Sequence, residues 1–271
     1  MAYFASDFQN VDAAGTTERF AGCLRLQLSL PFYRAYKQTT FELMRLRPGA
    51  SALEIGCGTG DDAVALARLV GPQGRVTAVD RSRAMLDQAE QTSRGLDLAL
   101  HFEQADARRL PYGNDRFDAA RVDRTLQHIA EPAAVIGEMA RVVRPGGRVV
   151  AMEPDWETFT VDSTNRALTR TLMNHWCDSF PAGWIGRALS GYFAAAGLTE
   201  IDVLPVTLVL REFALADQIL DLVQTARSAL QADIAEAAAV DAWLGELAEA
   251  DRAGAFFCSF TAFIVAGTKP A

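Results

Sequence analysis

The sequence has few cysteines, and none of them form a closely spaced pair. The 271-residue chain contains only Cys23, Cys57, Cys177 and Cys258, with no CxxC motif. Disulfide frameworks and cysteine-based zinc sites both depend on short, regular cysteine spacings. The pattern therefore argues against either kind of cross-link, and it predicts a protein of the reducing cytoplasm.

Long apolar runs and an excess of basic residues are also missing. No uncharged stretch approaches the roughly 18–20 residues of a membrane span, and the first ten residues lack the basic flank of a signal peptide. The formal net charge is −8 and the pI is about 5.0. Proteins that bind nucleic acid normally present a basic face to the phosphates. We therefore expect no membrane insertion, no nucleic-acid partner and a small-molecule ligand.

Short apolar runs alternate with amphipathic stretches through the first half of the chain. This pattern predicts an α/β fold in which helices flank a parallel sheet. Strands are expected at 52–56, 74–80, 98–106, 117–123 and 146–154. The intervening stretches have apolar residues at helical spacing; Ser82 is the expected N-cap of the second helix, and Pro145 with Gly146 the expected end of the third.

The chain contains no repeat, low-complexity tract or Pro/Gly linker, so we expect one domain over residues 1–271. Its predicted parts are an N-terminal helical lid (1–48, with helices in 16–46 broken near Pro31), a ligand-binding core (50–154) and a substrate-side half (155–271). The last part should contain helices in 163–196, strands at 200–210 and 256–270, and a helical insertion, 212–252. Two helices are expected in the insertion, 214–230 and 233–252, with Asp233 and Glu236 resembling a capping box. The insertion is a candidate lid or a candidate homodimer interface.

The most informative stretch is "ALEIGCGTGDD", residues 52–62. A strand, a glycine turn and a helix N-terminus together point backbone N–H groups and a helix dipole at a ligand. The dinucleotide-binding version of this turn has the spacing GxGxxG. Here the third glycine position is Asp61, and Asp62 follows it. Two carboxylates at this place would repel a diphosphate, so the ligand is not expected to be a dinucleotide.

Two further carboxylates indicate what the ligand contains. Asp80 ends the second predicted strand, 20 positions after Gly60, where an acid accepts hydrogen bonds from ribose hydroxyls. Asp106 ends the third predicted strand at the same sheet edge, where it can accept a hydrogen bond from the amine of adenine. A ribose and an adenine without phosphate describe S-adenosylmethionine.

With these residues the chain resembles the class I S-adenosylmethionine-dependent methyltransferases, in the branch that includes the ubiquinone and menaquinone biosynthesis enzymes. The resemblance rests on "LEIGCGTG", "VTAVDRSRAML", "QADARRLPYGNDRFDAA", "LQHIAEP" and "ARVVRPGGRVV", which together cover about residues 50–154. It implies a Rossmann-like seven-stranded sheet, mostly parallel with the last strand antiparallel, with helices on both faces.

The resemblance also implies a set of cofactor-binding residues. They are, for the methionine part, Glu54, Gly56, Cys57, Gly58 and Gly60; for the ribose, Asp80; for the adenine, Arg81, Met85, Asp106 and Ala107; and for the cofactor wall, Val122 and His128.

Candidates for catalysis are less well defined. His175 and His128 are candidate bases because histidine titrates near neutrality, and Asp155 is expected near the transferred methyl group. Each histidine can equally be structural. Asp123, Glu153 and Asp155 do not reproduce the spacing of magnesium-dependent methyltransferases, so no metal is expected. A pocket for a flat acceptor, or plain helix packing, would use the aromatic residues Phe32, Tyr33, Tyr36, Trp176 and Trp184.

The fourth predicted strand ends in "RVDRT" and not in the [DN]PP[YF] motif of many nucleobase and protein-amide methyltransferases. We therefore expect methyl transfer to O, N or C of a small organic acceptor, such as a natural product or a quinone-like metabolite, with S-adenosylhomocysteine as product. The alternative is a protein that binds S-adenosylmethionine without transferring its methyl group and assists a cyclisation or rearrangement.

Overall fold

The parallel part of the sheet is built from the five apolar runs in the first half of the chain. The computed structural model describes residues 7–8, 11–14 and 17–271. In it these runs form β1 (Ser51–Ile55), β2 (Arg75–Asp80), β3 (Leu100–Gln104), β4 (Phe117–Asp123) and β5 (Val143–Val161). Their pairings β3–β2, β2–β1, β1–β4 and β4–β5 are all parallel.

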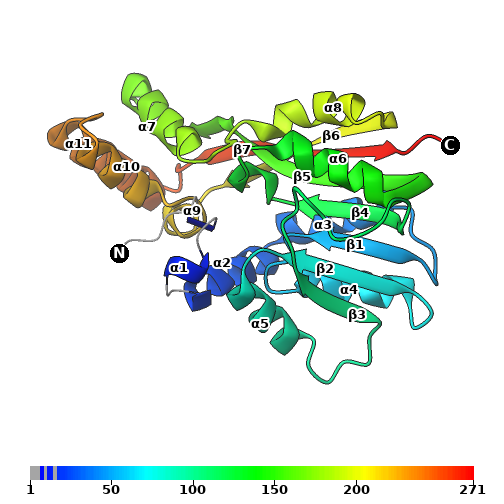
Figure 1. Ribbon diagram of the computed structural model, residues 1–271. Coiled ribbons are helices and arrows are strands. Elements are labelled where there is room, and N and C mark those ends of the chain that lie inside the picture. Colours follow the sequence, from blue (N-terminus) through cyan, green and yellow to red (C-terminus); the bar gives the residue numbers. More distant parts are fainter. Residues whose placement is uncertain (1–6, 9–10, 15–16) are drawn as a thin grey trace.

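Two late strands complete the sheet and reverse its direction. β6 (Thr199–Leu210) lies at the edge, and β7 (Cys258–Thr268) inserts antiparallel between β5 and β6. The strand order is β3-β2-β1-β4-β5-β7-β6 (Figure 1). The expected Rossmann-like fold, with seven strands and an antiparallel last strand, is confirmed.

Helices cover both faces of this sheet, and each helix buries one apolar side. α3 (Pro31–Leu43), α4 (Asp61–Val70) and α5 (Arg83–Thr92) lie on one face; α6 (Pro132–Val142) and α8 (Ile185–Ala195) lie on the other (Figure 1). Neighbouring residues of β1 separate accordingly, since Ala52 packs into the first core and Leu53 into the second.

The start of α5 is as predicted, whereas α6 ends earlier than predicted. The Ser82 hydroxyl accepts a hydrogen bond from the Met85 backbone N–H at 3.0 Å, which is an N-cap. α6 ends at Val142, three residues before Pro145, because the chain enters β5 at Val143. Strand pairing with β4 at Val143 thus replaces the expected proline stop.

The N-terminal segment forms helices with the predicted break. α1 (Val11–Ala14) and α2 (Thr17–Ser29) precede α3, which begins at Pro31. Proline is favoured in the first turn of a helix, because a backbone N–H at that position would have no acceptor within the helix. The expected lid (1–48) includes residues 1–6, 9–10 and 15–16, which lie outside the described residues.

The C-terminal helices differ from the prediction in number and in their starting points. α7 (Arg166–Asp178) precedes α8, and the insertion contains α9 (Phe213–Leu220), α10 (Leu222–Gln231) and α11 (Ala237–Arg252). The single helix expected at 214–230 is therefore wrong: Asp221 adopts a left-handed conformation (φ 48°) that ends α9 and starts α10. The capping box is also wrong, because Asp233 has φ 54° and α11 begins only after Glu236.

The expected boundary at residue 154 falls inside a strand. β5 continues to Val161 and pairs with β7 on both sides of a register shift between Asp155 and Thr160. The core and the substrate-side half therefore share one continuous strand.

Candidate functional site

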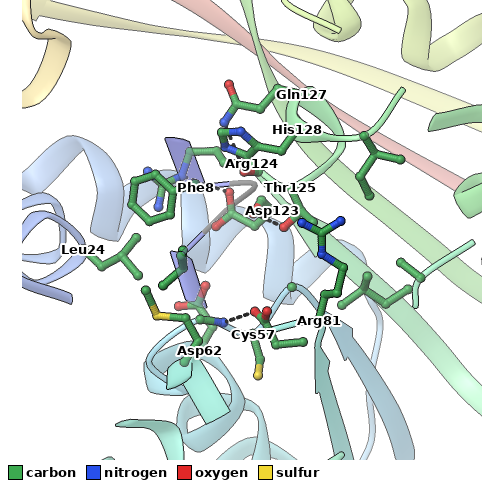
Figure 2. Close-up of a pocket in the computed structure, with 18 of the residues that line it drawn as sticks. Phe8, Leu24, Cys57, Asp62, Arg81, Asp123, Arg124, Thr125, Gln127 and His128 are labelled. Carbon is green, nitrogen blue, oxygen red and sulfur yellow. Dashed lines mark hydrogen bonds and ion pairs between the residues drawn. The ribbon is translucent and has the colours of Figure 1, made fainter. Parts of the chain in front are cut away.

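A cavity of about 400 Å³ opens at the carboxyl ends of β1, β2 and β4, the edge at which open α/β sheets bind ligands. The glycine turn after β1 lies on one side of it. The loop after β4, which contains the short helix η2 (Leu126–His128), lies on the other side (Figure 2). α2, α3 and α9 also contribute to its lining.

The glycine turn packs so closely against its neighbours that two of its positions have no room for a side chain. Gly56 has φ 67°, and a Cβ there would lie 2.1 Å from the Thr125 Oγ1 atom. Gly60 has φ 81°, and a Cβ there would lie 2.8 Å from the Ala89 Cβ atom. Gly56 and Gly58 line the cavity, whereas Gly60 packs against α5 and does not. The turn brings the backbone close to a ligand, and its last glycine serves helix packing.

Asp80 lies at the end of β2 and is held by the backbone. Its carboxylate accepts hydrogen bonds from the N–H groups of Gly58 at 3.0 Å and Ser82 at 2.9 Å. Burial raises the pKa of Asp80, and these N–H groups partly offset the shift. Each carboxylate oxygen has a second lone pair, so Asp80 retains the capacity to accept hydrogen bonds from a diol.

One of the residues predicted to bind the adenine is already paired within the protein. Arg81, Met85, Asp106 and Ala107 all line the cavity. Asp106, however, accepts hydrogen bonds from the Arg108 guanidinium, with Nη2 at 2.7 Å, and this interaction lowers the pKa of Asp106. An amine that approached Asp106 would have to displace or share that guanidinium.

One carboxylate oxygen of Glu54 has no partner among the described residues. Its Oε1 atom pairs with Arg121, while Oε2 is buried and accepts no hydrogen bond from any described residue. Burial raises the pKa of Glu54 to about 8, although Arg121 opposes the shift. An unsatisfied buried acceptor that lines a cavity is suited to receive a cationic donor from a ligand.

A buried charge cluster connects the N-terminal helices to the sheet. Lys37 of α3 pairs with Asp62 and, at 2.8 Å, with the Asp123 Oδ2 atom. Arg121 lies 2.9 Å from the same oxygen and 3.2 Å from Asp62. Burial alone would raise the pKa of Asp123, but Lys37 and Arg121 hold it below its ordinary value. Lys37, Asp62 and Asp123 line the cavity.

The loop after β4 contributes a second set of polar groups. The Gln127 side chain donates to the Arg124 carbonyl at 3.1 Å and accepts from Trp156 Nε1 at 2.7 Å. His128 lies between Phe8 and Phe180, with ring centroids at 5.8 and 5.6 Å. Burial, helped by Arg124, lowers the pKa of His128 to about 3, so its imidazole is neutral at pH 7. Figure 2 shows Arg124, Gln127 and His128 close together.

Aromatic side chains line the part of the cavity beyond this loop. Trp156 stacks on Phe180 with ring centroids 5.5 Å apart, and it contacts Phe260 at 4.6 Å and Trp176 at 5.4 Å. These four rings and Tyr33 all line the cavity and are buried. We call Tyr33, Trp156, Trp176, Phe180 and Phe260 the aromatic wall.

Comparison with known proteins places this site in a family. Residues 46–197 match the model of the methyltransferase domain. The chain belongs to the methyltransferase-domain family. It is 28% identical over 196 residues to a demethylmenaquinone methyltransferase of Bacillus cereus, which covers 66% of this chain and 83% of that enzyme.

A second relative is 40% identical over 233 residues, an uncharacterised 37.1 kDa protein of transposon TN4556 from Streptomyces fradiae. The match covers 86% of this chain, and the chain spans 66% of the length of that relative. The solved structure of YcgJ from Bacillus subtilis shares the fold, with a TM-score of 0.62 and 18% identity over 88% of this chain and 99% of that one. The protein is thus a class I S-adenosylmethionine-dependent methyltransferase, as the sequence predicted.

The residues of this methyltransferase fit its cofactor by their chemistry. The unpartnered Oε2 atom of Glu54, the cradle at Gly56 and Gly58, and the carboxylate of Asp80 offer partners for an ammonium group and a ribose. The thiol of Cys57 also lines the cavity, and burial holds its pKa well above the ordinary value. It therefore fills space and is not an ionised nucleophile.

Several predicted residues lie away from the cavity of the methyltransferase. Val122 faces the opposite core, with α6 and α8. His175 is bonded to the Ser228 hydroxyl at 2.8 Å, and Asp155 is paired with Arg187 at 2.7 Å. None of these three lines the cavity, so the structure does not bring the candidate bases His175 and His128 together with Asp155. Of the aromatic candidates, Tyr33 and Trp176 line it, while Phe32, Tyr36 and Trp184 do not.

Sequence reasoning did not find the contributions of Lys37, Arg124 and Gln127. Lys37 and Asp123 are separated by 86 positions, and no local pattern joins them. The only available signal for Lys37 was its helical spacing from Tyr33 and Thr40, which places it on the buried side of α3.

The acids considered as metal ligands do not converge. Glu153 binds backbone N–H groups of the loop after β4, Asp155 binds Arg187, and Asp123 joins the charge cluster. Within residues 7–8, 11–14 and 17–271, no group of three or more His, Cys, Asp or Glu side chains is arranged to hold a metal ion. Over the same part of the chain, no helix has the length and apolar character needed to cross a membrane.

Proposed function

We propose that this methyltransferase transfers the methyl group to a flat, largely apolar small molecule, a natural product or a quinone-like metabolite. The aromatic wall is the observation that carries the proposal. It lines the cavity with five aromatic rings, all of which belong to parts of the chain outside the cofactor-binding core. Ligand pockets commonly combine such apolar surfaces with a few polar groups that fix orientation.

The cofactor and acceptor ends of the cavity are connected by hydrogen bonds. Gln127 joins the Arg124 carbonyl in the loop after β4 to the Trp156 indole. An acceptor stacked on Trp156 would therefore be positioned relative to the same loop that adjoins Gly56 through Thr125. S-adenosylmethionine, when bound, supplies a methyl group activated by a sulfonium. Positioning and water exclusion then supply much of the rate enhancement of such a displacement.

His128, the candidate base that lines the cavity, is not a strong one. His128 is neutral, and its low pKa makes it a weak proton acceptor. We propose that His128 shapes the wall between Phe8 and Phe180. An acceptor whose nucleophile is already ionised, or needs no deprotonation, suits this site.

We also propose a compartment and partners for the enzyme. All four cysteines are free, which supports a cytoplasmic protein. The net charge of −8 and the enclosed aromatic wall favour a small molecule over nucleic acid as partner. A homodimer formed through the insertion 212–252 is a proposal that size-exclusion chromatography would test.

The direct test uses methyl-labelled S-adenosylmethionine, the purified protein and an extract of its own cells, separated into small-molecule and macromolecular fractions. Label in the small-molecule fraction is the expected result. Label in macromolecules would overturn the acceptor class. Cofactor binding by calorimetry without transfer to any fraction would favour the cyclisation or rearrangement alternative.

A further inference from the structure

Arg124 has an unusual backbone conformation that the fold maintains. It follows the last residue of β4 with φ 50°, a region that non-glycine residues rarely occupy. Its N–H donates to the Met152 carbonyl at 2.8 Å, and its carbonyl accepts from Gln127 at 3.1 Å. Strained residues of this kind persist where surrounding bonds over-determine them, often at functional sites. The Arg124 side chain lines the cavity (Figure 2).

The Arg124 guanidinium is only partly satisfied by the described residues. Nη1 donates to the Gln27 side chain, and Nε lies 3.4 Å from the Asp123 Oδ1 atom without forming a hydrogen bond. Arginine has five N–H donors. Asp123 also pairs with Lys37 and Arg121, so three cations share this one carboxylate. The side chain retains 18% exposure, and it lines the cavity.

The Arg124 guanidinium lies beside the aromatic wall, which lines the proposed acceptor end of the cavity. It lies over the Tyr33 ring at 5.0 Å, and Tyr33 belongs to the aromatic wall. Through its carbonyl and Gln127, Arg124 is also connected to Trp156. A planar cation next to stacked rings matches a ligand with a flat body and an anionic oxygen, because guanidinium binds such oxygens with two N–H groups at once.

We propose that Arg124 selects acceptors that carry an anionic oxygen, a carboxylate or an ionised phenol or enol, on a flat apolar body. This inference rests on the proposed function and specifies its substrate class. Arginine stays protonated at any relevant pH, so the selection does not depend on titration of the protein. The competing role for Arg124 is to bind the carboxylate of the cofactor, and the experiment below separates the two.

The test is calorimetric titration of the protein saturated with S-adenosylhomocysteine. The probes are the naphthoate anion, the dinitronaphtholate anion and the uncharged naphthamide. A buried charge-assisted hydrogen bond contributes about 1.5–3 kcal/mol, so at least one anion should bind about tenfold or more tightly than naphthamide. The naphthoate and naphtholate titrations distinguish a carboxylate from an ionised phenol.

Variants then assign the preference to Arg124. Arg124→Gln should abolish it while leaving affinity for S-adenosylhomocysteine within about twofold, and Arg124→Lys should retain part of it. Arg116→Gln, at an exposed arginine outside the cavity, is the matched control and should leave it intact.

Three results would overturn the inference. Equal affinity of the wild-type protein for the anions and for naphthamide would exclude anion selection. This comparison uses the wild-type protein alone, so it does not depend on whether any variant folds. A tenfold or greater loss of affinity for S-adenosylhomocysteine in Arg124→Gln would assign the side chain to the cofactor. Binding of none of the three probes would overturn the proposed flat acceptor and the inference together.

Discussion

The Glu153 Oε1 atom lies 2.7 Å from the backbone nitrogen of Thr125 and accepts its N–H. The same oxygen accepts the N–H of Leu126 at 2.6 Å. One buried carboxylate on β5 thus anchors the start of the loop that contains Gln127 and His128. The geometry of the polar side of the cavity therefore depends on a residue that does not line it.

Glu153 should make the stability of the protein depend on pH. Burial raises its pKa from 4.5 to about 8, so between those values the folded state binds more protons than the unfolded state. Its contribution to stability is fully present below about pH 4.5 and is lost as the pH rises through about 8. We expect the melting temperature to fall between pH 6 and pH 9, with a shallower fall in Glu153→Gln. Glu249→Gln, at an exposed glutamate, should follow wild type; identical slopes in Glu153→Gln and wild type would contradict the prediction.

Cofactor binding should release a proton from Glu54. With its pKa raised to about 8, this carboxyl is mostly protonated at pH 7 in the free protein. An ammonium group next to the unpartnered Oε2 atom favours the ionised form. Titration with S-adenosylhomocysteine in buffers of different ionisation enthalpy should report release of up to about one proton. Glu54→Gln should remove that part of the buffer dependence, and a wild type without buffer dependence would refute the assignment.

Replacement of Asp80 tests the ribose site. Asp80→Ala removes the carboxylate at the end of β2, and we expect affinity for S-adenosylmethionine to fall at least about tenfold, the loss of one or two hydrogen bonds to a charged group. Calorimetry measures it. Asp97→Ala, at an exposed aspartate, is the control, and unchanged affinity in Asp80→Ala would reject the role.

Alanine substitution of two glycines with similar φ angles distinguishes the effect of backbone strain from that of packing. Gly60→Ala introduces a Cβ that would lie 2.8 Å from the Ala89 Cβ atom, whereas Gly49, with φ 87°, has nothing within 4 Å. Both substitutions strain the backbone, but only the first overpacks the contact with α5. We expect Gly60→Ala to reduce the free energy of unfolding by about 1–3 kcal/mol more than Gly49→Ala. Equal losses in denaturant titrations would show that packing contributes nothing.

The sequence predicted most accurately the structural features that are determined by residues close together in the chain. The strands, the glycine turn and the Ser82 cap are encoded within short stretches, and all of them lie near the expected positions except that β5 extends further at both ends. Asp80 could be assigned from its spacing because a βαβ unit has a nearly fixed length. Most of the residues predicted to bind the cofactor therefore lie along one cavity, whereas Gly60 and Val122 do not line it.

The acceptor side was less predictable because distant segments form it. The alternation of side chains along a strand explains one error on the cofactor side as well: Val122 faces the core under α6, while its neighbour Asp123 faces the cavity. Asp221 and Asp233 adopt left-handed conformations that helix patterns do not reveal. The charge cluster requires α3 to pack on the sheet, a long-range event that no local pattern encodes.

The uninterrupted course of β5 has a consequence for substrate exchange. Glu153 and Trp156 are three residues apart on one strand that is paired with β7, so the polar loop and the main stacking surface cannot separate there. The side of the cavity that β5 forms is therefore held in place by the sheet. An acceptor then enters past the elements that border the cavity from outside that strand, among them α2, α3 and α9. The loop after β4, held by Glu153, and the ring of Trp156 are thus tied together by three residues of one strand.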